Sequence, residues 1–357
     1  MTSLGFEKST ADPSLYVKRE DGKVIMLVLA YVDDNITAGP DRDRILEFKR
    51  KFHEILDITD GGDLHFVLGI HVTRNPINRT ITLDQTTYIQ DVIRRSGMAD
   101  SHPVSTPLNP KGQLSSNQSP TTDDERRTVR ATYPDLNYLE VVGALLYACQ
   151  TRPDLTFAVN KLAQFGSNPG VAHYEALKRV LRYLNGTAHF GLTFGHSGDA
   201  VDLVGWTDSD WAQDPDSRRS IGGFVFNVAG GIVSWSSKKQ PTVALSTAES
   251  EYMAASNATK EAIWLQTLLS DMGFAQILAT TLFGDNQACI ALFRNPVAHS
   301  RAKHIDIRHH FIHEQVESHE INLEFCSTKD MLADIFTKQL PRVLFEKFQA
   351  ALGVGDN

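Results

Sequence analysis

The C-terminal half of the chain carries a fixed order of strand and helix patterns, and this order restricts the folds that it can adopt. The expected strands are Leu203–Thr207, Ile221–Asn227, Gly231–Trp235, Thr281–Gly284 and Asn322–Cys326. The expected helices are Thr247–Met272, Gln287–Arg294, Ile305–Ser318 and Lys329–Gln339. Three consecutive strands followed by alternating helices and strands predict a mixed five-stranded sheet with helices on its faces, which is an α/β fold.

The first third of the chain mixes strand and turn signals. Val24–Tyr31 has the apolar character of a buried strand, and Ile36–Ala38 is its expected partner. Asp33 and Asp34 fall between these two segments. The sequence therefore predicts a hairpin with acidic residues at its turn.

The middle of the chain changes from strands to helices. Leu64–Val72 and Thr80–Leu83 predict a second hairpin, and Leu139–Phe165 and Val171–Leu184 have helical character. Asn109–Thr132 is rich in Ser, Thr, Asn, Pro and charge, so it is expected to be an exposed loop or linker. These patterns divide the chain into an α+β part (1–108), a linker (109–132), a helical part (133–195) and an α/β domain (196–357).

Composition excludes several classes of protein. The 357 residues are 41% hydrophobic and 22% charged, which are ordinary values for a globular protein. The net charge of −8 argues against a protein that simply coats DNA, although basic faces of an enzyme can be local. No apolar run is long enough to span a bilayer, no secretory leader is evident, and the three cysteines are scattered. An intracellular, cytoplasmic or nuclear location is therefore expected, with no membrane partner.

Four carboxylates occupy positions that are not typical of solvent-exposed charged side chains. Asp208 and Asp285 each end an expected strand, where sites of α/β sheets are usually built. Glu251 points from the first turn of the long helix toward the sheet, and Asp334 lies on the packed side of the last expected helix. Glu249 has a separate role, because it completes a capping box with its helix start.

Carboxylates from separate elements at one sheet edge are typical ligands of hard cations. No His or Cys accompanies them, so Mg²⁺ or Mn²⁺ is expected rather than zinc. Two such ions roughly 4 Å apart can activate a water and stabilise the leaving oxygen of a phosphodiester.

The ordered motifs resemble those of copia-type LTR-retrotransposon Pol polyproteins. In the ribonuclease H part they are Trp206–Ala212, Ser234–Gln240, Ala248–Tyr252, Asp285–Gln287, Lys303–Arg308 and Ala333–Lys338. In the reverse-transcriptase part, Tyr31–Asp34 is similar to the catalytic turn and Leu68–Ile70 to the segment that supports the primer end. Thr151–Asp154 is similar to the connection region. The resemblance covers nearly the whole chain in the family's order.

The resemblance implies a partial reverse-transcriptase palm and thumb, a helical connection and a ribonuclease H-like domain. It implies hydrolysis of the RNA strand of RNA–DNA hybrids, with two divalent ions held by Asp208, Glu251, Asp285 and Asp334. Asp33 and Asp34 correspond to polymerase metal ligands. A further palm aspartate of the family would lie before Met1, so no polymerase activity is expected unless another Pol-derived chain supplies it.

The resemblance leaves one role unassigned. Some cellular ribonucleases H carry a mobile histidine shortly before the last aspartate, and Cys326–Ala333 contains none.

Other interpretations stay open. The chain could be a non-catalytic nucleic-acid-binding relic of the polyprotein. A histidine cluster consisting of His304, His309, His310 and His313 could hold zinc, which would make a hydrolase of another kind. Three basic groups are either solvated or contact nucleic acid. They are Lys178–Arg182, Arg218–Arg219 and Lys238–Lys239.

Overall fold

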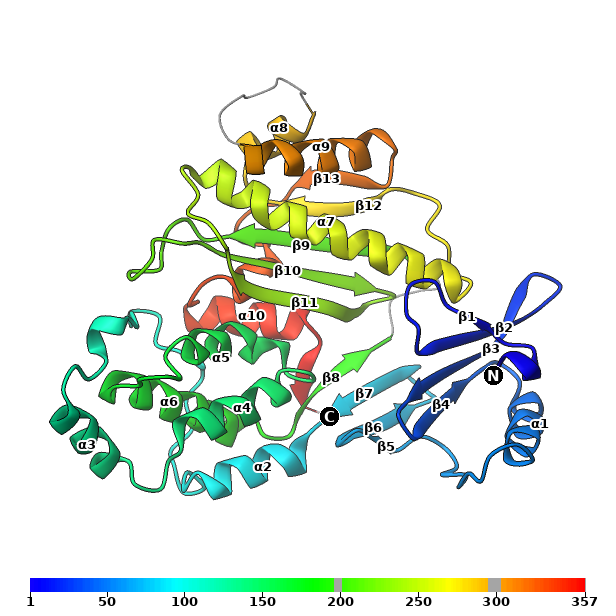
Figure 1. Ribbon diagram of the computed structural model, residues 1–357, viewed down its shortest axis with the longest axis horizontal. Helices are drawn as coiled ribbons and strands as arrows, with labels where there is room; N and C mark the ends of the chain where they lie inside the picture. The colour runs from blue at the N-terminus through cyan, green and yellow to red at the C-terminus, as the bar shows by residue number, and fades with distance from the viewer. Residues whose placement is uncertain (196–200, 295–302, 357) are drawn as a thin grey trace.

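The computed structural model describes residues 1–195, 201–294 and 303–356. Its C-terminal sheet has the strand order β11-β10-β9-β12-β13 (Figure 1). The strands are β9 (Leu203–Ser209), β10 (Ile221–Val228), β11 (Gly231–Lys239), β12 (Thr280–Gly284) and β13 (Ile321–Phe325). β9, β10 and β11 are antiparallel neighbours, whereas β12 runs parallel to β9 and β13. The predicted mixed five-stranded sheet is confirmed.

Helices cover one face of this sheet. α7 (Thr247–Asp271) crosses it, with α8 (Gln287–Arg294) and α9 (Lys303–Glu317) beside it (Figure 1). The apolar stripe of α7 is buried together with Phe226 and Leu282, which point to the same face. The opposite face carries Val225, which belongs to the core shared with the helical part.

The helical part contains α2 (Thr86–Arg95), α4 (Tyr138–Ala148), α5 (Thr156–Ala163) and α6 (Val171–Thr187). The expected single stretch Leu139–Phe165 is two helices, because the turn at Arg152 and Pro153 interrupts it.

The prediction of an irregular segment over Asn109–Thr132 is wrong at its end. η2 (Ser116–Gln118) is a single 3₁₀ turn, and α3 (Asp123–Thr132) is a regular helix. Thr122 and Glu125 form a capping box at the start of α3, and its first turn is acidic. Cap residues and charge form this helix without an apolar stripe, so a search for hydrophobic periodicity misses it.

A second sheet joins segments that are far apart in the sequence. Its order is β14-β8-β7-β6-β5. The strands are β5 (Phe66–Val67), β6 (Ile70–Asn75), β7 (Thr80–Asp84), β8 (Phe190–Phe194) and β14 (Val354–Asp356). The predicted hairpin of β6 and β7 is confirmed. Since the last strand pairs with β8, the C-terminal segment returns to the helical part, and the domain division at 195/196 remains a proposal.

The N-terminal sheet contains β1 (Glu7–Lys8), β2 (Leu15–Glu20), β3 (Lys23–Tyr31) and β4 (Asp34–Ala38), followed by α1 (Arg42–His53). The predicted hairpin of β3 and β4 is confirmed, with Tyr31 paired to Asp34. This sheet contacts the end of α7 (Figure 1), where Asp271 Oδ2 accepts a 2.7 Å hydrogen bond from Ser9.

The expected helix Lys329–Gln339 is also wrong. Only η4 (Leu332–Phe336), a short 3₁₀ helix, forms there, and the last helix is α10 (Arg342–Ala351). Pro341 immediately precedes α10, at a position where proline favours helix initiation. None of the helices in the described part of the chain combines the length and apolar character needed to cross a membrane.

Candidate metal centre

Asp208 lies near the end of β9 and is almost completely buried. Its neighbour in the sheet is Gly223 of β10. A Cβ on Gly223 would lie only 2.8 Å from Phe336 Cβ and 2.9 Å from Thr337 Cγ2. The glycine therefore lets the end of η4 approach the sheet, so that the Thr337 hydroxyl donates a hydrogen bond to Asp208 Oδ2.

Glu251 lies in the first turn of α7 and is buried. Ser246 is the N-cap of α7, as predicted: the Glu249 amide donates to its Oγ at 3.2 Å. The Glu249 carboxylate accepts a 2.8 Å hydrogen bond from the amide of Leu245, one residue before the Ser246 amide that the capping box predicted. Glu251 has no such capping role and faces the sheet edge.

Asp285 follows β12 and is partly exposed. Thr328 Oγ1 donates a 2.9 Å hydrogen bond to its Oδ2. One carboxylate oxygen each of Asp208, Glu251 and Asp285 lies within 4.8 Å of the other two. Three of the four predicted carboxylates thus converge on one point.

Asp334 lies in η4 and is not a member of this group of three. Its link to the group is Lys338, whose Nζ is 2.9 Å from Asp334 Oδ1 and 3.2 Å from Asp208 Oδ1. Asp208 therefore lies between the other two carboxylates of the group and the Lys338–Asp334 ion pair.

Burial raises the pKa values of Glu251, Asp208 and Asp334. The pKa of Glu251 is well above its ordinary value because of burial and the nearby charges of Asp208 and Asp285. Burial also raises the pKa of Asp208, although Lys338 and Thr337 oppose the shift. The pKa of Asp334 rises to about 7 because of burial and the charge of Asp208. Their negative charge is thus incompletely compensated by the protein.

This donor set fits a hard divalent cation. All its ligand atoms are carboxylate oxygens, which suit Mg²⁺ or Mn²⁺. Cys289 lies near Glu251, and burial raises the pKa of its thiol well above the ordinary value. Its sulfur is not among the grouped ligand atoms, which all belong to carboxylates.

Two residues of the centre were missed by sequence reasoning. Asp210 is buried, accepts a hydrogen bond from the Ile221 amide, and has a pKa raised to about 7 by burial and the charge of Asp208. The spacing of Asp208 and Asp210 by two residues could have indicated it, since such positions share a face of an extended chain. Lys338 follows Asp334 by four residues, a spacing that could have indicated their ion pair.

The expected polymerase residues lie elsewhere. Asp33 and Asp34 are exposed at the turn between β3 and β4. In the described ranges, neither joins a group of three possible metal ligands.

The histidine cluster is only partly visible. The side chains of His304 and His309, like those of the whole motif Lys303–Arg308, lie outside the described residues. His310 is exposed, and His313 Nδ1 is 3.3 Å from Glu317.

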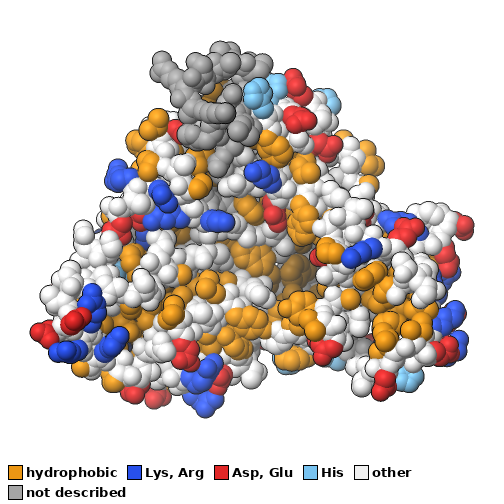
Figure 2. Space-filling view, in the orientation of Figure 1, with side chains coloured by type: hydrophobic (Ala, Val, Ile, Leu, Met, Phe, Trp, Pro, Cys, Tyr) orange, Lys and Arg blue, Asp and Glu red, His pale blue; other side chains and the backbone are white. Residues whose placement is uncertain are grey.

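The basic side chains have different environments. Lys239 forms an ion pair with buried Asp214, which also pairs with Lys161 of α5 at 3.2 Å, so Lys239 has a structural role. Lys238 and Arg219 are exposed. On the face shown in Figure 2, Lys and Arg side chains form small groups among acidic ones, so a nucleic-acid contact there would be local.

Comparisons with known proteins found a matching family and similar solved structures. Residues 1–110 match the family described as "Reverse transcriptase (RNA-dependent DNA polymerase)". A ribonuclease H1 isolated from compost by a metagenomic approach overlaps 41% of this chain and 97% of its own, with 15% identity and a TM-score of 0.28.

Two relatives identify the family. The chain is 39% identical to the retrovirus-related Pol polyprotein from transposon TNT 1-94 of Nicotiana tabacum, over 100% of this chain and 26% of that protein. It is 30% identical to the putative transposon Ty5-1 protein YCL074W of Saccharomyces cerevisiae, over 73% of this chain and 81% of that protein. The chain thus spans about a quarter of the tobacco polyprotein, and it belongs to the copia-type retrotransposon Pol polyproteins, a family of nucleic-acid-processing enzymes.

Proposed function

We propose that this chain is a reverse transcriptase/ribonuclease H fragment that hydrolyses the RNA strand of RNA–DNA hybrids. The observation that carries the proposal is the group formed by Asp208, Glu251 and Asp285, whose carboxylate oxygens lie within 4.8 Å of one another. Three buried or half-buried carboxylates at this spacing are costly without a cation, so a cation-dependent reaction is the use that best fits them.

In this proposal each carboxylate has a distinct position. Asp208, Glu251 and Asp285 hold one divalent ion, and Asp208 together with Asp334 holds a second. Such ions, when bound, supply a water of lowered pKa and stabilise the departing ribose oxygen. Thr337 orients the Asp208 carboxylate through its hydrogen bond to Oδ2.

The other predictions from the sequence stay part of the proposal. Asp33 and Asp34 are proposed metal ligands of a polymerase site. The expected substrate is an RNA–DNA hybrid, recognised through groove shape and the 2′-hydroxyl groups. The expected location is intracellular, and other Pol-derived chains are possible partners.

The test is cleavage of a labelled RNA–DNA hybrid by the full chain with Mg²⁺, Mn²⁺ or a chelator. We expect metal-dependent cleavage that Asp208→Asn lowers by about 100-fold or more. Asp202→Asn is the matched control, because it makes the same change at an exposed carboxylate of the same region.

Two results would contradict the proposal. Equal cleavage by the Asp208→Asn and control variants would place the activity elsewhere. Hybrid binding without cleavage, by folded protein and with both metals tried, would favour the alternative of a non-catalytic nucleic-acid-binding relic.

A further inference from the structure

Lys338 places a positive charge inside the candidate metal centre. Its Nζ lies 2.9 Å from Asp334 Oδ1 and 3.2 Å from Asp208 Oδ1. The side chains of Asp208 and Asp334 are 1% and 3% exposed, so this ion pair is largely shielded from water. Within the described part of the chain, no other Lys or Arg forms an ion pair with Asp208, Glu251, Asp285 or Asp334.

The lysine contacts one side of the centre only. It bridges Asp208 and Asp334, whereas Glu251 and Asp285 approach Asp208 as members of the three-carboxylate group. Asp208 therefore belongs to two subsites. The first, with Glu251 and Asp285, holds no lysine or arginine among the described residues, and the second, with Asp334, holds the ammonium group of Lys338.

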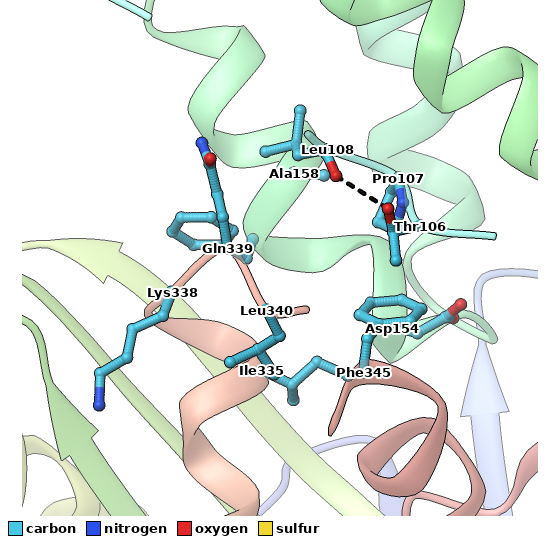
Figure 3. Close-up of a pocket in the computed structure, with 11 residues that line it drawn as sticks. Thr106, Pro107, Leu108, Asp154, Ala158, Ile335, Lys338, Gln339, Leu340 and Phe345 are labelled. Atoms are coloured by element: carbon cyan, nitrogen blue, oxygen red, sulfur yellow. Dashed lines mark hydrogen bonds between the residues drawn. The ribbon is translucent and has the colours of Figure 1, made fainter. Parts of the chain in front are cut away.

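The backbone holds Lys338 close to Asp334. Its amide donates a 3.0 Å hydrogen bond to the Asp334 carbonyl oxygen, directly after η4. This segment is anchored against the helical part, where Ile335, Leu340 and Phe345 line a small cavity of about 20 Å³ together with residues such as Leu108 (Figure 3).

The Lys338 side chain carries its ammonium group away from the cavity. Figure 3 shows it extending away from the other labelled residues of the cavity. The side chain is 27% exposed, so its flexible stem has a route to solvent.

An ammonium group and a divalent ion compete for the same carboxylate oxygens. Like charges a few ångströms apart repel strongly where water is excluded. The buried Asp208–Asp334 pair needs a positive charge for its own stability, and the ammonium supplies that charge when no divalent ion is bound.

We propose that Lys338 is a built-in cation of the second subsite. It neutralises Asp208 and Asp334 in the metal-free protein and must leave them before they can share a divalent ion. The lysine therefore weakens binding of the second ion, whose two ligands it bridges, more than that of the first ion, whose group of Asp208, Glu251 and Asp285 it contacts only at Asp208. This inference rests on the proposed function, because it concerns the same centre.

The test is calorimetric titration of the full chain with Mn²⁺ in the absence of nucleic acid. We expect Lys338→Met to bind the second ion about tenfold more tightly than the unmodified chain, since the competing charge is gone. Lys338→Arg keeps the charge and Lys238→Met removes one from an exposed lysine, so both should titrate like the unmodified chain.

A second measurement needs no variant, in case Lys338→Met folds poorly. Amine acylation followed by mass spectrometry should show Lys338 protected without Mg²⁺ and more reactive with it, relative to Lys238. Unchanged reactivity of Lys338 on addition of Mg²⁺ would overturn the inference.

The outcomes separate this inference from the proposed function. If the unmodified chain binds two ions and cleaves the hybrid, but Lys338→Met binds the second ion no more tightly, only the role of Lys338 is refuted. The same holds if Lys338→Arg binds it as tightly as Lys338→Met. If the unmodified chain neither binds Mn²⁺ nor cleaves, both fail.

Discussion

Arg152 is completely buried, and its replacement should show how strongly the C-terminal segment depends on the helical part. Its guanidinium donates two hydrogen bonds to Asp154, at 3.0 and 2.9 Å, and one of 2.6 Å to the Thr187 carbonyl oxygen. Gln349 of α10 donates a 3.0 Å hydrogen bond to Asp154 from almost 200 residues away in the sequence. Tyr183 also contacts both members of the pair.

We expect Arg152→Met to lower the free energy of unfolding by about 3–5 kcal/mol, the usual cost of removing one partner of a buried ion pair. The loss arises because Asp154 remains buried with its negative charge uncompensated. Methionine keeps much of the apolar volume of the side chain, so the change reports mainly on the charge and hydrogen bonds.

The assay is urea unfolding of the full chain, followed by circular dichroism. Arg127→Met is the matched control, because Arg127 pairs with Asp124 at 3.1 Å while both side chains are largely exposed. The control should cost less than about 1 kcal/mol. If Arg152→Met is no more destabilising than Arg127→Met, the buried network does not stabilise the fold as we reason.

Three further predictions concern titratable groups. Burial alone would raise the pKa of Asp214, but hydrogen bonds from Lys239 and Ser217 outweigh it and hold that pKa well below its ordinary value. The stabilising effect of Asp214 is complete above the unfolded pKa of about 4 and declines gradually as the pH falls toward the much lower folded pKa, so Asp214→Asn should be most destabilising at pH 7 and measurably less so at pH 3 in urea titrations. An equal effect at both pH values would contradict this. With a chelator present, Glu251→Gln should raise the melting temperature, because burial and neighbouring charges raise the pKa of the Glu251 carboxyl group and the variant removes that group. The variant should also show a smaller rise in melting temperature on addition of Mn²⁺. A lower melting temperature in chelator would argue against repulsion among the carboxylates. Because burial raises the pKa of Asp334 to about 7, the folded state binds the proton more tightly than the unfolded state, and metal-free stability should fall as the pH rises from about 4 to 7. Asp334→Asn should flatten this part of the profile, and identical profiles would refute the assignment.

Much of the fold was predictable because its signals are local. The strands of the C-terminal sheet, the hairpin of β3 and β4 and the start of α7 follow from apolar periodicity and from cap residues such as Ser246. Each of these signals lies within a few residues of the element that it specifies.

The failed predictions have different physical causes. α3 forms through its caps and its acidic first turn, and α10 begins directly after Pro341, so neither depends on a strong apolar stripe at its start. Asp334 was assigned to a helix from its spacing, but the segment is a short 3₁₀ helix because packing against β9 and β10 decides its path.

The sequence by itself determined the kind of chemistry, because carboxylates at strand ends and in a helix's first turn suit hard cations in any arrangement that brings them together. Only the tertiary structure decided which of them meet. Asp208 lies 130 residues from Lys338 in the chain, and their contact depends on η4 crossing the sheet at Gly223. That crossing brings the group of three together, places Asp334 apart from it, and puts Lys338 between Asp334 and Asp208. Contacts between residues so far apart in the sequence depend on the path of the whole chain rather than on any local pattern.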